Sequence, residues 1–138
     1  MSTKILAVET DANILHLLAV KLRKAGYEVI TANDGDEAVR LAQAEKPDVV
    51  ISEVILPGLK GLALTRRLKA ESQTAPMVIL LTVLDSDRDV AAGFAAGADD
   101  YMTKPFSPLV LVERVRVNLI RTGRISPDGA GESEVADG

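Results

Sequence analysis

The sequence contains no cysteine and no tryptophan, and aromatic residues make up only 3% of its 138 residues. Without cysteine there is no disulfide bond and no thiolate metal site, which fits a reducing compartment. So few aromatic side chains offer no stacking platform for nucleic-acid bases. The net charge of -4 also disfavours contact with a phosphate backbone. We therefore expect no direct binding to nucleic acid.

Long apolar runs are missing as well. The first residues, Met1 to Lys4, lead straight into a short strand-like run rather than into the longer apolar segment of a signal peptide. No later run reaches the length of a membrane-spanning helix. We expect a cytoplasmic protein that makes no membrane contact.

What the sequence does have is a regular alternation of two patterns, in a chain long enough for one domain with its own core. Short apolar runs, typical of buried strands, cover residues 5–8, 27–32, 48–52, 77–81 and 101–103. Between them, apolar residues recur at helical spacing. The expected helices are 14–25 with Asn13 as cap, 36–45, 62–70, one from a cap at Asp85 or Ser86 to Gly97, and 108–121.

This alternation predicts an α/β fold. Parallel strands need helical crossovers, so five strands alternating with five helices indicate a (βα)5 doubly wound parallel sheet covered on both faces. The domain is expected to span residues 1–122. After Thr122 the composition changes to glycine, serine and acidic residues without an apolar period, so residues 123–138 are expected to be a disordered tail or a truncated linker.

Polar side chains follow four of the predicted strands at the point where each strand ends. In open α/β sheets, functional sites form at the carboxyl ends of the strands. Strand ends are polar in many folds, but carboxylates, a hydroxyl and an ammonium at one edge are a more specific combination. The residues expected to converge are Glu9, Thr10, Asp11, Glu53, Thr82 and Lys104.

Several segments of the chain resemble the signature segments of response-regulator receiver domains. The similarity covers residues 3–121 and is most specific at Ile55-Leu56-Pro57-Gly58 and from Gly97 through Asp100 and Tyr101 to Lys104-Pro105-Phe106. The resemblance implies a flavodoxin-like fold with strand order 2-1-3-4-5, which the element count alone does not determine.

The resemblance also assigns roles. Receivers accept a phosphoryl group from a histidine kinase onto an aspartate after the third strand, which binds Mg²⁺ together with an acidic pair after the first. Here the acceptor position is Glu53, and the acidic pair falls on Glu9 and Thr10. Thr82 corresponds to the switch hydroxyl, Tyr101 to the switch aromatic and Lys104 to the lysine that binds phosphoryl oxygens.

The acidic positions depart from the family pattern. Thr10 lacks the formal charge of a carboxylate, and Glu9 and Glu53 are each longer than aspartate by one methylene, or about 1.5 Å of reach. Mg²⁺ requires near-ideal octahedral oxygen coordination, and phosphoryl transfer depends on positioning and on the metal. We expect no bound metal or other cofactor and no autophosphorylation. Instead, Lys104 should form a charge-assisted hydrogen bond with Glu53.

Two other functions stay open at this point. One is a conventional Mg²⁺-dependent receiver, phosphorylated by a histidine kinase on Glu53 or Asp11. The other is a flavodoxin-type cofactor binder, against which the few aromatic residues and the missing glycine-rich phosphate loop count. The Glu53–Lys104 contact could either hold the switch in one state or serve only to pair a buried acid.

The last helix points to a protein-binding face. Four consecutive apolar residues, 109–112, cover more than one side of a helix, so at least one should be exposed. In receivers, the fourth helix, fifth strand and fifth helix form the usual partner surface, here expected to include Asp100, Leu109, Val110 and Arg114. The expected partners are a histidine kinase or a downstream signalling protein, with a homodimer as a further option. His16, the only histidine, is expected on the surface.

Overall fold

The computed structural model describes residues 2–70 and 75–127 of the chain. Every expected strand and helix is present, with bounds shifted by a few residues at most. The strands are β1 (Lys4–Val8), β2 (Glu28–Ala32), β3 (Val49–Ser52), β4 (Met77–Thr82) and β5 (Asp100–Thr103). The helices are α1 (Ala12–Lys24), α2 (Gly35–Glu45), α3 (Gly61–Lys69), α4 (Asp87–Ala95) and α5 (Pro108–Arg121).

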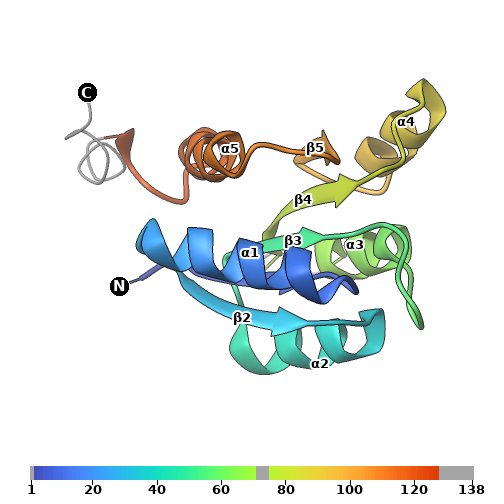
Figure 1. Ribbon diagram of the computed structural model, residues 1–138, viewed down its shortest axis with the longest axis horizontal. Coiled ribbons are helices and arrows are strands. Elements are labelled where there is room, and N and C mark those ends of the chain that lie inside the picture. Colours follow the sequence, from blue (N-terminus) through green and yellow to red (C-terminus); the bar gives the residue numbers. More distant parts are fainter. Residues whose placement is uncertain (1, 71–74, 128–138) are drawn as a thin grey trace.

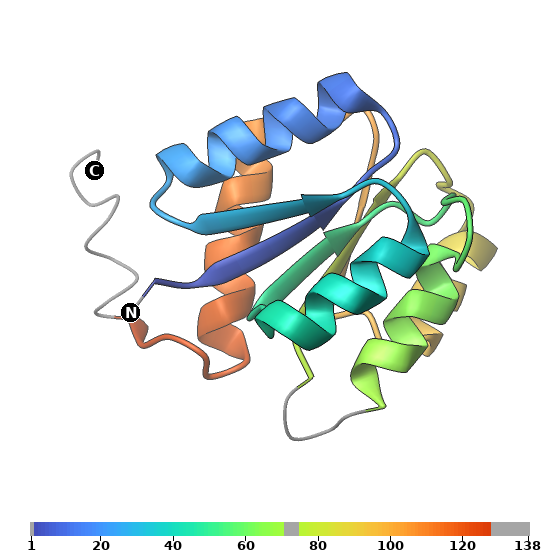
Figure 2. The same cartoon turned by 90° about the horizontal axis from the view of Figure 1, so that it is seen from below.

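The strands form one parallel sheet in the order β2-β1-β3-β4-β5, which confirms the order that the resemblance implied. All four strand pairs are parallel. Helices α1 and α5 cover one face of the sheet, and α2, α3 and α4 cover the other (Figures 1 and 2). The carboxyl ends of all five strands therefore lie along one edge of the sheet.

The core has two halves, one on each face of the sheet. Within β1, Ile5 and Ala7 pack toward α1 and α5, whereas Leu6 and Val8 pack toward the opposite layer. Because both faces are covered, every residue of β3 and β4 and all of β1 except Lys4 are buried, which explains why these strands read as continuous apolar runs. Each fully buried leucine or isoleucine contributes about 1.5–3 kcal/mol to folding.

The helix caps mostly follow the sequence signals, with one error. The cap of α1 is Asp11 rather than Asn13, because Asp11 is the last extended residue and its Oδ1 accepts the N–H groups of Asn13 (2.9 Å) and Ile14 (3.2 Å). Ser86, one of the two predicted candidates, caps α4 in a reciprocal capping box with Asp89.

The segment that follows α5 stays in contact with the domain up to the last described residues. Arg124 donates from Nη2 to the carbonyl of Ala75 at 2.6 Å, and Ile125 packs against the core beneath α1 and α5. Residues 128–138 of the expected tail lie outside the described residues. His16 is exposed, as expected. Among the described residues, no helix combines the length and apolarity needed to cross a bilayer.

Candidate functional site

Backbone hydrogen bonds extend the sheet past its strand ends and fix the residues of the site. Glu9 donates its N–H to Ala32 (3.1 Å), and Glu53 donates its N–H to Val8 (3.0 Å). Lys104 follows β5 in the same way, with an N–H bond of 2.8 Å to the last residue of β4. The sheet thus places the Cα atoms of three charged residues along one edge.

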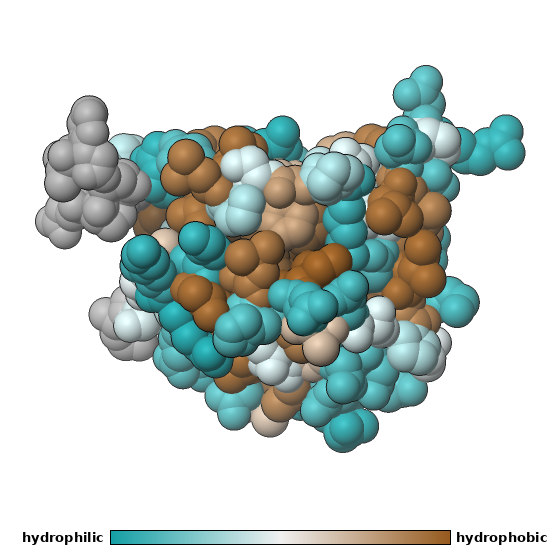
Figure 3. All heavy atoms as spheres, in the orientation of Figure 1, coloured by the Kyte–Doolittle hydropathy of each residue, from teal (hydrophilic) through white to brown (hydrophobic). Residues whose placement is uncertain are grey.

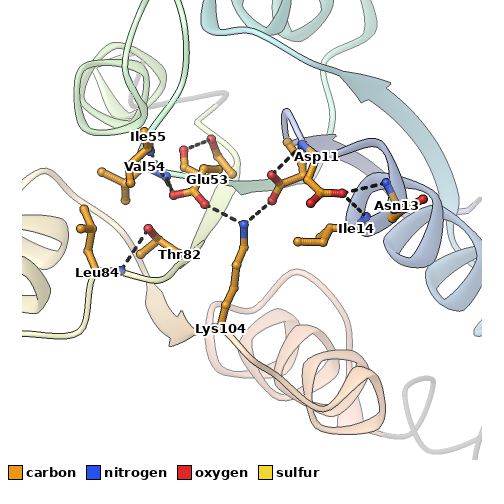
Figure 4. A network of polar contacts seen from close by, with 11 residues as sticks. Asp11, Asn13, Ile14, Glu53, Val54, Ile55, Thr82, Leu84 and Lys104 are labelled. Carbon is orange, nitrogen blue, oxygen red and sulfur yellow. Dashed lines mark hydrogen bonds and ion pairs between the residues drawn. The ribbon is translucent and has the colours of Figure 1, made fainter.

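The side chains of Glu9, Glu53 and Lys104 meet in a buried cluster that we call the ion triad. Lys104 Nζ lies 2.6 Å from Glu9 Oε1 and 2.7 Å from Glu53 Oε1. Figure 4 shows the lysine reaching up from its loop toward the carboxylate of Glu53. Only 11% of the Lys104 side chain is exposed, against 3% for Glu9 and 6% for Glu53. The expected Glu53–Lys104 bond is therefore present, and Glu9 shares the same ammonium.

The remaining carboxylate oxygens of the ion triad also have donors. Glu53 Oε2 accepts the N–H groups of Val54 (2.6 Å) and Ile55 (3.0 Å), visible in Figure 4. Glu9 Oε2 accepts the N–H of Asp11 at 3.0 Å. The longer side chain of Glu53 thus folds back onto its own loop, and each acid is held at both of its oxygens.

These contacts favour the charged forms of Glu53 and Lys104. Burial alone raises the pKa of Glu53, but the bond from Lys104, the Thr82 hydroxyl and the Ile55 N–H together bring that pKa below its ordinary value of 4.5. Burial lowers the pKa of Lys104, but its bonds to Glu53 and Glu9 outweigh this and raise the pKa above 10.5. At both groups desolvation is the largest single cause, and the hydrogen bonds and nearby charges together outweigh it.

Thr82 and Tyr101, the two switch positions, are both attached to Leu84. The fully buried Thr82 accepts the Leu84 N–H at Oγ1 (3.3 Å), and the Tyr101 hydroxyl donates to the Leu84 carbonyl at 2.7 Å. Tyr101 is only 9% exposed, and its ring centroid lies 6.4 Å from that of Phe94 on α4. Its side chain is therefore turned into the domain.

Gly93 of α4 makes the inward position of Tyr101 sterically feasible. A Cβ atom added at Gly93 would lie 2.7 Å from Tyr101 Cδ2 and 2.8 Å from Cε2, closer than carbon atoms approach in proteins. A glycine inside a helix is otherwise unfavourable by about 0.5–1 kcal/mol relative to alanine. Sequence reasoning missed this contact, although a glycine within an apolar helical pattern was a signal that could have found it.

Thr10 occupies the position where the resemblance places the second residue of the acidic pair. Its side chain is not part of the ion triad. Thr10 is exposed and lines an open polar groove with Asn33, Asp34 and Asp36 on the α2 side. Asp11, the other acid of this loop, caps α1 with Oδ1. Across residues 2–70 and 75–127, no three acidic or histidine side chains gather in a way that could hold a metal ion.

These residues do not fit the Mg²⁺ site that the resemblance implies. Mg²⁺ needs oxygen ligands in octahedral geometry, yet the two carboxylates present already bind an ammonium and backbone N–H groups at short range. A cation at this place would have to displace the Lys104 ammonium.

The predicted partner face has exposed apolar side chains, and its charged side chains pair with each other within the chain. Leu109 is 81% exposed and Val110 45%, whereas the next residue, Leu111, is 1% exposed, so the expectation of an exposed residue in this run is confirmed. Asp100 forms an ion pair with Arg114 at 2.9 Å within the same chain. The buried Asn118, which sequence reasoning missed, donates to the second oxygen of Asp100 at 2.9 Å.

The neighbouring acid, Asp99, has a different role. It pairs with Lys69 of α3 at 2.7 Å and accepts the N–H of Val78 at 2.8 Å, so it joins α3 to the sheet. Arg121 donates to its backbone carbonyl at 3.2 Å. Arg114 contacts Asp100 and not this neighbouring acid.

Comparison with known proteins identifies the family. The model of the response regulator receiver domain matches residues 5–116. The chain is 39% identical over 138 residues to the alkaline phosphatase synthesis transcriptional regulatory protein PhoP of Bacillus subtilis, covering 100% of this chain and 57% of that protein. The chain spans about half the length of the curated relatives it matches.

Solved structures agree with this result. The BeF3-activated N-terminal receiver domain of RstA from Klebsiella pneumoniae is 38% identical with a TM-score of 0.79, over 85% of this chain and 98% of that one. The response regulator DrrB of Thermotoga maritima is 40% identical with a TM-score of 0.79, over 88% of this chain and 54% of that one.

Proposed function

The chain belongs to the response regulator receiver domain family of two-component signalling, and from this premise we propose that it signals without a phosphoryl group. Its output is then a set of protein contacts made by the face of α4, β5 and α5. The observation that carries the proposal is the ion triad, in which one lysine already neutralises part of the charge of both buried acids.

The ion triad supports this reading because it occupies the atoms that phosphoryl transfer needs. An attacking carboxylate oxygen must be free to approach phosphorus in line, and charge on the transferred group must be neutralised. In this site Glu53 Oε1 faces the ammonium and Oε2 faces two backbone N–H groups. The metal ligand expected at position 10 is a hydroxyl, and it points to a separate groove.

We infer further that the domain rests in the signalling-competent state. In phosphorylatable relatives, the switch aromatic turns inward when the switch hydroxyl moves toward the phosphoryl group. The inward Tyr101 and its bond to Leu84, which also contacts Thr82, correspond to that arrangement. Glu53 then stands where a negatively charged group would otherwise be added, and its bond to Lys104 biases the two-state switch.

The partner is proposed to be a histidine kinase or a downstream signalling protein. Leu109 and Val110 present exposed apolar surface at the start of α5, and such surface favours protein contacts. Arg114 and Asp100 pair within the chain. A partner therefore meets these two residues as a neutral ion pair, or it breaks the pair and forms new ion pairs with each residue. A homodimer through this face is a further option.

Intact-mass analysis tests the proposal. The protein is incubated with acetyl phosphate and Mg²⁺, and a receiver with aspartate at the acceptor position serves as the positive control. We expect no gain of mass within the time in which the control is fully labelled. Prompt addition of one phosphoryl group on Glu53 or Asp11 would overturn the proposal and restore the conventional Mg²⁺-dependent reading.

A further inference from the structure

A second surface lies beside the site, on the loops that follow β3 and β4. An open groove of about 670 Å³ runs between the β3–α3 loop, α3 and the β4–α4 loop, and we call it the Ile55 groove. The apolar part of its lining includes Ile55, Leu59, Leu62 and Leu84. The Ile55 side chain is 52% exposed. Figure 3 shows hydrophobic surface in this region between α3 and α4.

Hydrogen bonds of the main chain fix the two loops that form the Ile55 groove. In the β3–α3 loop, the N–H of Ile55 binds Glu53 Oε2 at 3.0 Å. In the β4–α4 loop, Leu84 donates its N–H to Thr82 Oγ1 at 3.3 Å. The groove is therefore formed before any ligand arrives, so binding does not carry the entropic cost of ordering these loops.

The charged residues that line the Ile55 groove are both basic. Lys60 and Arg66 are exposed, and neither forms an ion pair with any of the described residues. Residues 54–70 contain four basic residues and no acid, although the net charge of the chain is -4. The exposed charged residues that follow Leu84 lie outside the lining and have both signs: Asp85, Asp87 and Arg88. The groove itself therefore attracts negative charge.

Lys60 contradicts the local preference of its own helix. It stands at the N-cap of α3, where a side-chain oxygen normally accepts a free N–H group of the first turn. Lysine has no acceptor atom, and α3 has no side-chain cap. The helix dipole also disfavours a cation at this end, whereas it favours Arg66 in the last turn. The fold of the domain therefore does not explain Lys60, whereas a bound carboxylate would.

We propose that the Ile55 groove binds an acidic segment of a partner protein, with apolar side chains in the groove and a carboxylate at the start of α3. That carboxylate pairs with Lys60 and supplies the missing cap to the first turn of α3, whose residues Leu62 and Ala63 line the groove. A second acid of the segment pairs with Arg66. A basic segment would meet like charges here, so electrostatic complementarity selects against it.

This surface is separate from the exposed start of α5. The inference does not depend on whether Glu53 is phosphorylated, and it requires no movement of the loops, because their main-chain bonds already hold the groove open. What the groove adds is a chemical preference: it recognises a partner by acidic and apolar side chains in one short segment.

Selection from a phage-displayed library of short random peptides, with the whole chain as bait, tests this preference. We expect the recovered peptides to combine aspartate or glutamate with large apolar residues. The peptide recovered most often is then titrated by fluorescence anisotropy. The variant K60E/R66E should weaken its binding about tenfold or more, because each favourable pair becomes a like-charge contact. The same peptide with its acids replaced by lysine should bind K60E/R66E more tightly than the wild type.

The apolar half of the contact is tested by Ile55→Ala, which should weaken the peptide about fivefold because it removes exposed apolar surface from the groove. The Ile55 N–H that binds Glu53 is unchanged by this substitution. Raising the salt concentration should weaken binding to the wild type, since the pairs with Lys60 and Arg66 are exposed to solvent.

The matched control is K21E/K24E, which makes the same change of charge at two exposed lysines of α1, on the opposite face of the sheet. It should leave the affinity constant within about twofold. Circular dichroism of each variant verifies that it is folded. Recovered peptides without acids, a selection that yields no specific binder, unchanged affinity in K60E/R66E, or an equal loss in K21E/K24E would each overturn the inference. None of these outcomes bears on the mass analysis that tests the proposed function.

Discussion

The carboxylates of Glu9 and Glu53 reach one and the same ammonium group, that of Lys104, at 2.6 and 2.7 Å. The two acids come from the ends of adjacent parallel strands, β1 and β3, so the sheet itself brings their like charges together. Close carboxylates cannot both stay ionised in a buried place unless a cation stands between them. Lys104 meets that need, and the electrostatic state of the whole site therefore depends on a single side chain.

Replacement of Lys104 by methionine should destabilise the domain by about 3–5 kcal/mol at neutral pH, because two buried carboxylates lose their common partner. Urea unfolding followed by circular dichroism measures the change. Arg40→Met is the control: Arg40 is exposed and forms no ion pair with the described residues, so its loss should stay within about 0.5 kcal/mol. Equal effects of the two substitutions would contradict a stabilising role for the triad.

The stability should depend on pH at both ends of the scale. The pKa of Glu53 is below 4.5 in the folded protein, so its contribution is complete above about pH 4.5 and is lost as the pH falls through the lowered pKa. The pKa of Lys104 is above 10.5, so its contribution is complete below that pH and is lost as the pH rises through the raised pKa. Urea midpoints of wild type and Glu53→Gln, measured from pH 2 to 7, test the acid side. An acid loss of the same size in both proteins would argue against Glu53 as its source.

Gly93→Ala should displace Tyr101 from its inward position and break its bond to Leu84, because the new Cβ would overlap the ring. With no tryptophan in the chain, and with Tyr27→Phe as background, tyrosine fluorescence reports on Tyr101 alone. We expect stronger quenching by iodide and a loss of about 1–3 kcal/mol of stability.

A second substitution separates the steric cause from helix propensity. In a Tyr101→Ala background the overlap with the ring is gone, so Gly93→Ala should become neutral or stabilising by up to about 1 kcal/mol. If the substitution destabilises both backgrounds equally, the contact between Gly93 and Tyr101 is not the reason for the glycine.

Restoring aspartate at two positions should restore affinity for Mg²⁺. The double variant T10D/E53D regains a second carboxylate near Glu9 and shortens the acid that folds back onto its loop. We expect calorimetric titration to show Mg²⁺ binding at least about tenfold tighter than in the wild type. Wild-type protein that binds Mg²⁺ as tightly as the double variant would remove the basis for a silent site.

Two leucines of α5 that lie two positions apart should respond in different ways. Leu109→Glu changes an 81% exposed side chain and should alter stability by no more than about 0.5 kcal/mol while weakening partner binding. Leu111→Ala removes a buried side chain and should cost about 2–5 kcal/mol. Thermal unfolding measures the effect on stability, and a pull-down with a histidine kinase that binds the wild-type domain measures the effect on partner binding. Partner binding unchanged by Leu109→Glu would exclude that residue from the face.

Much of the fold followed from the sequence because its signals are local. Apolar runs located the strands, and Ser86 and Pro108 marked the starts of helices where the structure has them. The cap of α1 was misplaced because Asp11 and Asn13 are equally good cap residues and only backbone conformation distinguishes them. The strand order required the resemblance to a family, since several doubly wound orders obey the handedness rule.

Most residues of the site were predictable, and so was one of its contacts, but the other contacts were not. The position of Glu53 and Lys104 at neighbouring strand ends predicted a bond between them, and the structure has that bond. The sharing of Lys104 by Glu9 depends on side-chain rotamers, and the support of Asp100 by Asn118 depends on how α5 lies against β5. The approach of Gly93 to Tyr101 likewise arises only once α4 is packed on the sheet.

Each charged residue of the triad donates its main-chain N–H to a neighbouring strand. Glu9 donates to β2, Glu53 to β1 and Lys104 to β4. These positioning bonds involve only main-chain atoms, so they do not depend on which side chains stand at the three positions. Substitutions at these three positions therefore replace the functional groups of the site while the main-chain bonds that position them remain, so the chemistry of this edge can diverge without a change of architecture.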